Sequence, residues 1–207
     1  MLKNIIFDMG NVLLRFEPDL FIQALGVTDP EVHSRLRREV FGSVEWVMQD
    51  WGTLTEEESA ERICLRLPEE LREMARQLIF RWNEPIRPID GMAELVRDCK
   101  EAGMGIYLLS NASVRLPEYW PGVPGSEYFD GVAVSGLLHM VKPMPEIYRY
   151  VLQTYGLKAE ESIFVDDTPM NVAGAMQVGI RGFLFRGDAN ALREALREQG
   201  ANISVSL

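Results

Sequence analysis

Residues Ile5-Ile6-Phe7-Asp8-Met9-Gly10-Asn11-Val12 form the segment from which the architecture can be inferred. Its first three side chains make a short apolar run, and such a run bounded by turn residues is typical of a parallel strand buried on both faces. Asp8, Gly10 and Asn11 all favour a turn, so the strand is predicted to end there. The segment therefore predicts a buried strand that presents a carboxylate at one edge of a sheet.

Apolar runs of the same kind recur along the chain and alternate with helical patterns. The runs span residues 106–109, 163–165 and 183–185, with a weaker one at 132–134. The helical patterns span residues 91–102, 145–155, 169–178 and 189–198, and each is followed by a glycine, a common residue after a helix C-terminus. This alternation predicts a doubly wound α/β fold with a mainly parallel, Rossmann-like sheet, whose ligands bind at the carboxyl ends of the strands.

One long segment, residues 17–85, carries helix signals but no convincing strand. Thr55 with Glu58, for example, fits a capping box at a helix N-terminus. We expect four or five short helices here, inserted after the first strand and therefore placed over the carboxyl end of the sheet. The chain is predicted to divide into an α/β core domain, residues 1–16 and 86–207, and an all-helical cap domain, residues 17–85.

The composition excludes several classes of partner. The 207 residues carry 21 Lys and Arg against 31 Asp and Glu, a formal net charge of −10, which repels nucleic acid and anionic membrane surfaces. No apolar run approaches the roughly 20 residues of a membrane helix, and Asp8 comes too early for a signal peptide. We expect a cytoplasmic monomer or homodimer, with Cys64 and Cys99 as buried thiols.

Four polar features follow the apolar runs: Asp8, the pair Ser110-Asn111, Lys142 and the pair Asp166-Asp167. Taken singly, each has a structural explanation, since aspartate and asparagine favour turns, serine caps helices, and lysine is usually a solvated surface charge. The carboxyl ends of parallel strands, however, meet at one edge of a sheet. The four features are therefore predicted to lie together.

These residue types suit the transfer of a phosphoryl group. A carboxylate such as Asp8 can attack phosphorus and form a covalent aspartyl-phosphate. Repulsion between carboxylate and phosphate must be balanced by a hard cation on oxygen ligands and by positive or hydrogen-bonding groups. Asp8 with Asp167 could hold Mg²⁺, while Lys142 with Ser110 could face the phosphoryl oxygens.

The segments around these residues are similar to the four sequence motifs of the haloacid dehalogenase-like hydrolases, over nearly the whole chain. The motifs stand here as residues 5–12, residues 108–111 (Leu-Leu-Ser-Asn), residues 141–143 (Val-Lys-Pro) and residues 164–167 (Phe-Val-Asp-Asp). The helical segment resembles the family's cap. Within the family, the chain resembles a branch that includes bacterial glucose-1-phosphate phosphatase and the phosphatase domain of soluble epoxide hydrolase.

The resemblance implies a magnesium-dependent phosphatase that hydrolyses a small phosphomonoester, a phosphorylated metabolite such as a sugar phosphate, beneath the cap. By motif, Asp8 is implied to be the nucleophile and a Mg²⁺ ligand, and Lys142 to balance charge on nucleophile and phosphate. The other implied roles are phosphate binding by Ser110 and Asn111, Mg²⁺ binding by Asp167 and by the backbone carbonyl of Gly10, and support by Asp166 and Asn171.

One residue departs from the family pattern. In family phosphatases a second aspartate of the first motif protonates the leaving oxygen and then activates water, but Gly10 stands at that position here. General acid–base help is typically worth about 10²- to 10⁴-fold in rate. Asp166, Asn11 through an ordered water, or a side chain from the cap could take over the role.

The same glycine leaves other functions open. A catalytically reduced phosphate-binding or regulatory protein would not need an acid at Gly10. A 2-haloacid dehalogenase of the same fold is a third interpretation, which the adjacent acids Asp166 and Asp167 disfavour, because that branch does not require both.

Substrate specificity is expected to come from the cap. Candidates near its inter-helix turn, or just after the second motif, are Trp46, Asp50, Trp51, Thr53, Tyr119 and Trp120. Large aromatic residues more often pack in a core than bind a ligand, so Trp46 and Trp51 are the weaker candidates, whereas Tyr119 and Trp120 could line the entrance of the site or an oligomer contact. The two histidines, His33 and His139, are not expected to be catalytic.

Overall fold

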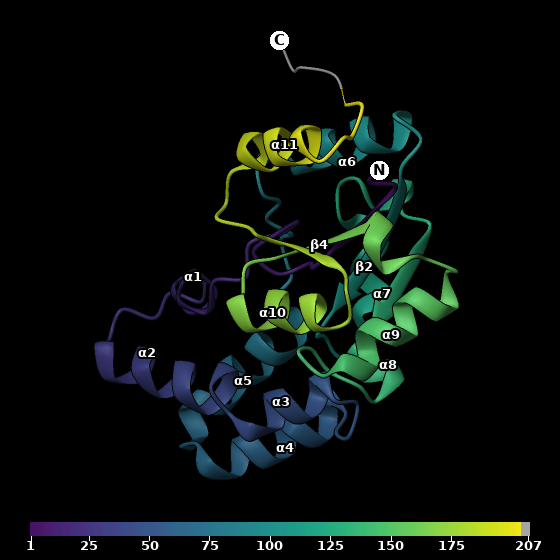
Figure 1. Cartoon of the computed structure of the whole chain (residues 1–207). Helices are drawn as coiled ribbons and strands as arrows, with labels where there is room; N and C mark the ends of the chain where they lie inside the picture. Colours follow the sequence, from purple (N-terminus) through teal and green to yellow (C-terminus); the bar gives the residue numbers. More distant parts are fainter. Residues whose placement is uncertain (204–207) are drawn as a thin grey trace.

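The computed structural model describes residues 1–203. At its centre lies a five-stranded sheet in which every pairing is parallel. The strand order is β3-β2-β1-β4-β5, so the chain crosses from one side of β1 to the other. The strands are β1 (Asn4–Phe7), β2 (Gly105–Ser110), β3 (Gly131–Val134), β4 (Ser162–Asp166) and β5 (Arg181–Leu184). Helices cover both faces of this sheet (Figure 1). The predicted doubly wound α/β fold is therefore confirmed.

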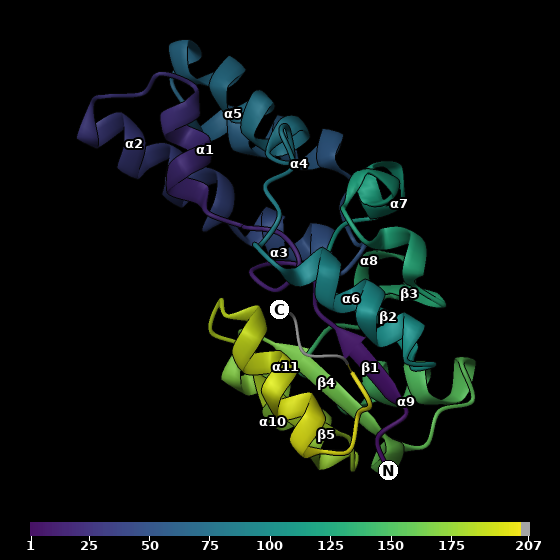
Figure 2. The ribbon, with the colours of Figure 1, turned by 90° about the horizontal axis from the view of Figure 1, so that it is seen from above.

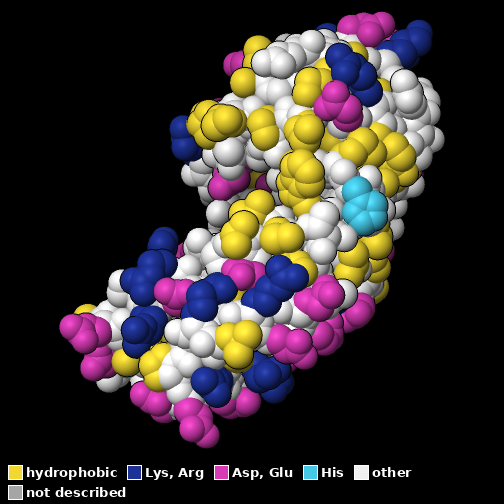
Figure 3. Space-filling view, turned by 90° about the horizontal axis from the view of Figure 1, so that it is seen from below, with side chains coloured by type: hydrophobic (Ala, Val, Ile, Leu, Met, Phe, Trp, Pro, Cys, Tyr) yellow, Lys and Arg dark blue, Asp and Glu magenta, His cyan; other side chains and the backbone are white. Residues whose placement is uncertain are grey.

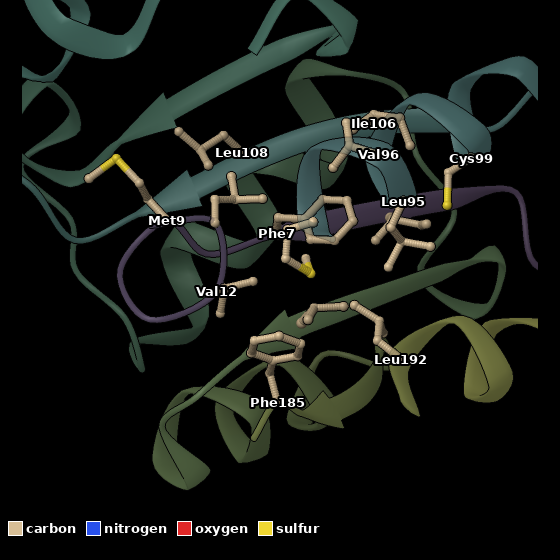
Figure 4. Close-up of a cluster of buried hydrophobic side chains, with 14 of the residues drawn as sticks. Phe7, Met9, Val12, Leu95, Val96, Cys99, Ile106, Leu108, Phe185 and Leu192 are labelled. Atoms are coloured by element: carbon tan, nitrogen blue, oxygen red, sulfur yellow. The ribbon is translucent and has the colours of Figure 1, made fainter. Parts of the chain in front are cut away.

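The central strand packs on both sides, because successive side chains of a strand point to opposite faces. The covering helices are α6 (Met92–Glu101), α9 (Pro145–Thr154), α10 (Pro169–Gln177) and α11 (Ala189–Glu198). Ile5 and Phe7 lie in the apolar cluster of α6 and α11, whereas Ile6 lies in the cluster of α9 and α10. Figure 4 shows Phe7 among side chains from α6, from β2 and from the segment after β5.

The edge strand β5 differs from its prediction. It spans Arg181–Leu184 rather than residues 183–185, and Phe185 lies beyond its end. Phe185 is nevertheless buried, and its N–H donates to Asp166 O at 2.9 Å. Phe183 and Leu184 of the predicted run pair with β4, whereas Phe185 packs in the apolar cluster that includes Leu192 and Leu196 of α11. The helix predicted over 189–198 has those bounds, and the three other predicted helices are one residue shorter at one or both ends.

Residues 17–85 contain helices and no strand. The elements are α1 (Pro18–Ala24), α2 (Pro30–Leu36), the π-helical turn η1 (Arg37–Phe41), α3 (Val44–Asp50), α4 (Glu56–Arg66) and α5 (Glu69–Arg81). The predicted capping box at the start of α4 is present, since Thr55 accepts from the Glu58 N–H and Glu58 accepts from the Thr55 N–H. Apolar side chains of these helices form a cluster of their own, separate from the two sheet clusters.

Figure 2 shows these helices extending away from the sheet, beyond the end toward which the arrow of β1 points. In the view of Figure 3, acidic and basic side chains are interspersed over the lower left of the molecule, where these helices lie, and hydrophobic side chains gather nearer its middle. The separate apolar cluster supports our proposal that residues 17–85 form a cap domain on a core of residues 1–16 and 86–207. We refer to residues 17–85 as the cap.

Short helical turns complete the described chain. They are α7 (Leu116–Tyr119), η2 (Trp120–Gly122), η3 (Ser126–Tyr128), α8 (Ser135–Leu138) and η4 (Ala159–Glu161). Cys64 and Cys99 are both buried free thiols, as expected. Within residues 1–203, the helices are too short or too polar to cross a lipid bilayer.

Candidate active site

Two neighbouring strands place a cluster of carboxylates at the carboxyl edge of the sheet. β1 and β4 pair with Phe7 beside Val165, so the residues that follow, Asp8 and Asp166, are also neighbours. Together with Asp167, each offers a carboxylate oxygen that lies within 4.8 Å of the other two. The sequence motifs at the ends of two distant strands therefore meet.

Lys142 bridges this cluster from the loop before α9. Its Nζ lies 2.7 Å from Asp8 Oδ1 and 2.7 Å from Asp166 Oδ2, and the residue is only 4% exposed. Burial opposes a charged amine, but the adjacent Asp8 and Asp166 carboxylates outweigh it and raise the pKa of Lys142. The lysine is therefore held in its charged form between two acids.

The side chain of Asn111 fixes the backbone of Lys142. Asn111 Oδ1 accepts from the Lys142 N–H at 2.9 Å, and Asn111 Nδ2 donates to Lys142 O at 3.1 Å. Both ends of the amide are thus engaged within the protein, and the predicted contact of Asn111 with phosphoryl oxygens stays a prediction. Ser110, at the end of β2, is 1% exposed and lines the adjacent cavity.

Asp166 is surrounded by donors. Besides Lys142, its oxygens accept from the Thr168 N–H at 2.8 Å and from Asn171 Nδ2 at 3.1 and 3.2 Å, and the side chain is fully buried. A carboxylate with its lone pairs occupied in this way orients its neighbours. The geometry therefore favours Asp8 and Asp167, rather than Asp166, as groups available to a cation.

The carboxyl of Asp8 is costly to ionise where it lies. Burial is the main reason why its pKa is raised from 3.8 to about 7, and Asp166 adds repulsion, while Lys142 and the Met9 N–H oppose the shift. Asp167 lies further out and accepts from Asn11 Nδ2 at 3.1 Å and from Thr168 Oγ1 at 3.2 Å. A site that destabilises its own carboxylate in this way gains from an added positive charge.

The donor chemistry fits a hard divalent cation. Asp8 and Asp167 supply carboxylate oxygens, and Gly10, which lines the same cavity, has a backbone carbonyl. Magnesium commonly uses one or two protein carboxylates and keeps water and phosphate oxygens as its other ligands. His33 and His139 lie outside the cavity wall, so the site lacks the nitrogen ligands typical of zinc.

A cavity of about 290 Å³ lies between this cluster and the cap. Its core side includes Asp8, Gly10, Ser110, Lys142 and Asp167, and its cap side includes Trp46, Gln49, Asp50, Glu56 and Ile79. Phe16, Trp82 and Tyr119 add aromatic rings, with Phe16 and Trp82 in edge-to-face contact at 5.1 Å between centroids. The cavity thus joins a charged floor to a wall that is partly polar and partly aromatic.

Half of the specificity candidates reach this cavity. Trp46, Asp50 and Tyr119 line it, whereas Trp51, Thr53 and Trp120 do not. The Thr53 hydroxyl donates to Met48 O at 3.1 Å and so closes the end of α3. Trp120, predicted at the entrance or an oligomer contact, instead packs in the core against Phe129.

Two cap residues that line the cavity, Gln49 and Glu56, were not among the predicted site residues. Gln49 is 3% exposed, and its Nε2 has no hydrogen-bond partner in the described chain. Glu56 accepts from the Ser113 hydroxyl, which follows β2. The sequence carries no signal for the contact of Glu56 with Ser113, because the two residues are 57 positions apart along the chain.

Asp50, in the cap, has a side-chain carboxyl whose pKa is strongly raised. Burial is the main reason why the pKa of its carboxyl is raised from 3.8 to about 7, and the nearby Asp8 and Glu56 raise it further, whereas Lys142 lowers it. Asp50 is therefore a protonated or half-ionised acid at neutral pH.

We expect Asp50→Asn to stabilise the protein above neutral pH. Between about pH 4 and pH 7 the unfolded chain ionises this carboxyl while the folded chain keeps it protonated, so its contribution to stability is full below about pH 4 and is lost as the pH rises to 7. One pKa unit corresponds to about 1.4 kcal/mol, so the gain near pH 8 is on the order of 2 kcal/mol after allowance for partial exposure.

Urea unfolding in magnesium-free buffer, at about pH 4 and about pH 8, measures this effect. The exposed acid of the same cap in Glu57→Gln is the matched control and should change stability little at either pH. An equal gain for Asp50→Asn at both pH values contradicts the assignment of a raised pKa.

Comparison with known proteins identifies the family to which the chain belongs. The model of the haloacid dehalogenase-like hydrolase family matches residues 2–179. The chain belongs to this family of hydrolases, and the predicted family resemblance is confirmed.

Three relatives cover most of the chain. It is 28% identical over 190 residues to the sesquiterpene phosphatase astK of Aspergillus oryzae, covering 87% of this chain and 88% of that protein. It is 27% identical over 196 residues to the D-ribitol-5-phosphate phosphatase of Bacteroides thetaiotaomicron, covering 88% and 91%. A haloacid dehalogenase family enzyme of B. thetaiotaomicron, solved with magnesium and inorganic phosphate, superposes with a TM-score of 0.71 at 21% identity, covering 93% and 99%.

Proposed function

We propose that the protein is a magnesium-dependent phosphatase that hydrolyses a small phosphomonoester through an aspartyl-phosphate on Asp8. One observation carries the proposal: Lys142 Nζ lies 2.7 Å from both Asp8 and Asp166, inside a three-carboxylate cluster that faces a cavity. Relatives of similar length that are named as phosphatases support the same activity.

In the proposed reaction, an Asp8 oxygen forms a bond to phosphorus as the bond from phosphorus to the leaving oxygen breaks. Lys142 keeps one Asp8 oxygen in place and offsets the negative charge that gathers at the reacting centre. Ser110 lines the cavity next to this centre and can donate its hydroxyl to a phosphoryl oxygen. Water then attacks the aspartyl-phosphate, which releases inorganic phosphate and restores Asp8.

Asp8, Asp167 and the Gly10 carbonyl would hold the magnesium ion, which when bound supplies charge neutralisation for the phosphate. Asn11 orients Asp167 by the 3.1 Å hydrogen bond from its amide. Asn171, through its contacts with Asp166, keeps the second acid of the pair turned toward Lys142.

The substrate that we propose is a small phosphorylated metabolite, and a sugar phosphate is one candidate. The cavity wall supports this class, because Gln49 and Asp50 offer hydrogen-bonding groups beside the rings of Trp46, Trp82 and Tyr119. A screen of sugar phosphates, polyol phosphates, nucleotides and prenyl monophosphates with Mg²⁺ compares polar with apolar leaving groups directly.

Metal removal tests the proposed function. We expect the protein to hydrolyse p-nitrophenyl phosphate with Mg²⁺, and we expect chelation to lower the rate at least about 100-fold, because a bound metal supplies several kcal/mol of charge stabilisation. Addition of excess Mg²⁺ should restore the rate. Hydrolysis that is indifferent to the chelator contradicts the proposal.

The same preparations discriminate the two alternatives. Halide release from a 2-haloacid in chelator-treated buffer would identify a dehalogenase. Magnesium-dependent binding of phosphate esters with no turnover across the panel would identify a phosphate-binding or regulatory protein, the function that Gly10 left open.

A further inference from the structure

Two acidic side chains of the cap line the cavity opposite the carboxylate cluster: Asp50 and Glu56. The carboxylate of Glu56 is engaged by the Ser113 hydroxyl. The side-chain carboxyl of Asp50 has neither a hydrogen bond nor an ion pair within residues 1–203, although Asp50 lines the cavity. Asp50 is therefore the cap acid that is available to a bound ligand.

The backbone of Asp50 is fixed to the core beside the phosphate-binding edge. Ser135 Oγ donates to Asp50 O at 2.5 Å and accepts from the Ala112 N–H at 2.9 Å, so a single hydroxyl links the cap to the loop that follows Ser110. Gly52 approaches Gly136 so closely that a Cβ there would lie 1.9 Å from the Gly136 carbonyl oxygen. These contacts hold the C-terminus of α3 at a set position over the sheet.

The polar neighbours of Asp50 include two residues of the proposed reacting centre, Asp8 and Lys142. The charges of Lys142, Asp8 and Glu56 act on the Asp50 carboxyl, and together with Asp50 and Tyr119 these residues line one cavity. His139 lies behind the same turn, with its Nδ1 at 3.1 Å from the backbone oxygen of Trp51, outside the cavity wall. Burial keeps the Asp50 carboxyl protonated up to about pH 7, so it carries a proton that it can donate.

The acids on the sheet side already accept hydrogen bonds from neighbouring residues. Asp166 accepts from Lys142, Thr168 and Asn171 and is fully buried, and Asp167 is held by Asn11 and Thr168 at the cation site. Gly10 has no side chain to contribute. Among the acids that line the cavity, one that is free to protonate the leaving group is therefore found on the cap side.

We propose that Asp50 is the general acid of this hydrolase, delivered by the cap in place of the carboxyl that Gly10 lacks. The proposal rests on the phosphatase function proposed above. As Asp8 forms its bond to phosphorus and the bond to the leaving oxygen breaks, the Asp50 carboxyl transfers its proton to that oxygen and becomes a carboxylate. In the second step the Asp50 carboxylate takes a proton from the water that attacks the aspartyl-phosphate, and the acid is restored.

Leaving-group dependence tests this assignment in the magnesium-loaded enzyme. The variant is Asp50→Asn, the substrates are p-nitrophenyl phosphate and an alkyl phosphate, and the measured quantity is kcat/KM, which reports the steps up to departure of the leaving group. We expect kcat/KM for the alkyl ester to fall about 10²- to 10⁴-fold, because an alkoxide needs a proton to leave. The value for the nitrophenyl ester should fall less than about 10-fold, and Glu57→Gln should change neither.

A second variant keeps the test independent of any structural effect of Asp50→Asn. A Cβ at Gly10 would meet only Phe16 Cβ, at the ordinary contact distance of 3.7 Å, so the backbone has room for a side chain to begin at this position in Gly10→Asp. If Asp50 is the acid, Gly10→Asp should raise the alkyl-phosphate activity of Asp50→Asn by a much larger factor than it changes that of the parent enzyme, which is the signature of two groups that share one role.

The outcomes separate the two proposals. Equal losses for both esters in Asp50→Asn, or an equal gain from Gly10→Asp in both backgrounds, overturn the assignment of Asp50 while leaving the phosphatase function intact. Absence of magnesium-dependent hydrolysis of either ester by the parent enzyme overturns the phosphatase function itself, and the Asp50 assignment falls with it.

Discussion

Asp8→Asn should abolish hydrolysis, with a loss in kcat of at least about 10⁴-fold, which is the scale seen when a nucleophile is removed. Asparagine preserves the shape of the side chain but cannot form a stable acyl-phosphate. Lys142 keeps Asp166 as its partner at 2.7 Å, so we expect the fold to survive the substitution. The effect is therefore on chemistry rather than on folding.

Steady-state kinetics with p-nitrophenyl phosphate, together with mass spectrometry of acid-quenched enzyme for a phosphoryl adduct, measure this outcome. Asp90→Asn is the control: it makes the same chemical change at a side chain that is 97% exposed, and it should leave the rate unchanged. A variant Asp8→Asn with the parent rate would remove Asp8 from the mechanism and with it the proposed function.

Lys142→Met should impair both stability and catalysis. It removes the amine between Asp8 and Asp166 and leaves two buried carboxylates side by side. Loss of one partner from a buried ion pair typically costs about 3–5 kcal/mol, and loss of one charge-stabilising donor lowers the rate about 10²- to 10³-fold. The unbalanced carboxyls should then bind protons more tightly in the folded state than in the unfolded state.

The pH dependence of this destabilisation distinguishes charge from packing. A raised folded-state pKa contributes stability that is present at low pH and lost as the pH rises, so Lys142→Met should be least destabilised near pH 5 and most destabilised near pH 8. Lys158→Met, at an exposed lysine, is the matched control and should show little change. A loss of stability that does not vary with pH would indicate that packing of the lysine side chain, rather than its pairing with the two carboxylates, is what matters.

The parts of the structure that could be predicted are those encoded locally. The apolar run at residues 5–7 and the polar residues after it predicted a central strand with Asp8 at its end, and β1 has that form. Parallel pairing in register then brings Asp8 to Asp166 without further information, because the strand ends meet at one edge. Motif order was sufficient to place the carboxylate cluster and Lys142.

Other features depend on contacts between distant segments and leave no local pattern. The hydrogen bond from Ser135 to Asp50 spans 85 positions in the chain, and neither residue type predicts it. Gln49 looked like an ordinary polar helix residue, although its amide is buried in the cavity wall. Asn111 also holds the backbone of Lys142, a contact over 31 positions that its predicted role at the phosphate did not include.

The close approach of Gly52 to Gly136 has a consequence for how the cap meets the core. Gly52 has a φ of +68°, and any side chain there would collide with the opposing carbonyl, so every larger residue would act as a wedge between cap and core. The hydrogen bonds from Ser135 to Asp50 and from Ser113 to Glu56 also join the core to the cap. Movement of the cap away from the core would have to break both hydrogen bonds.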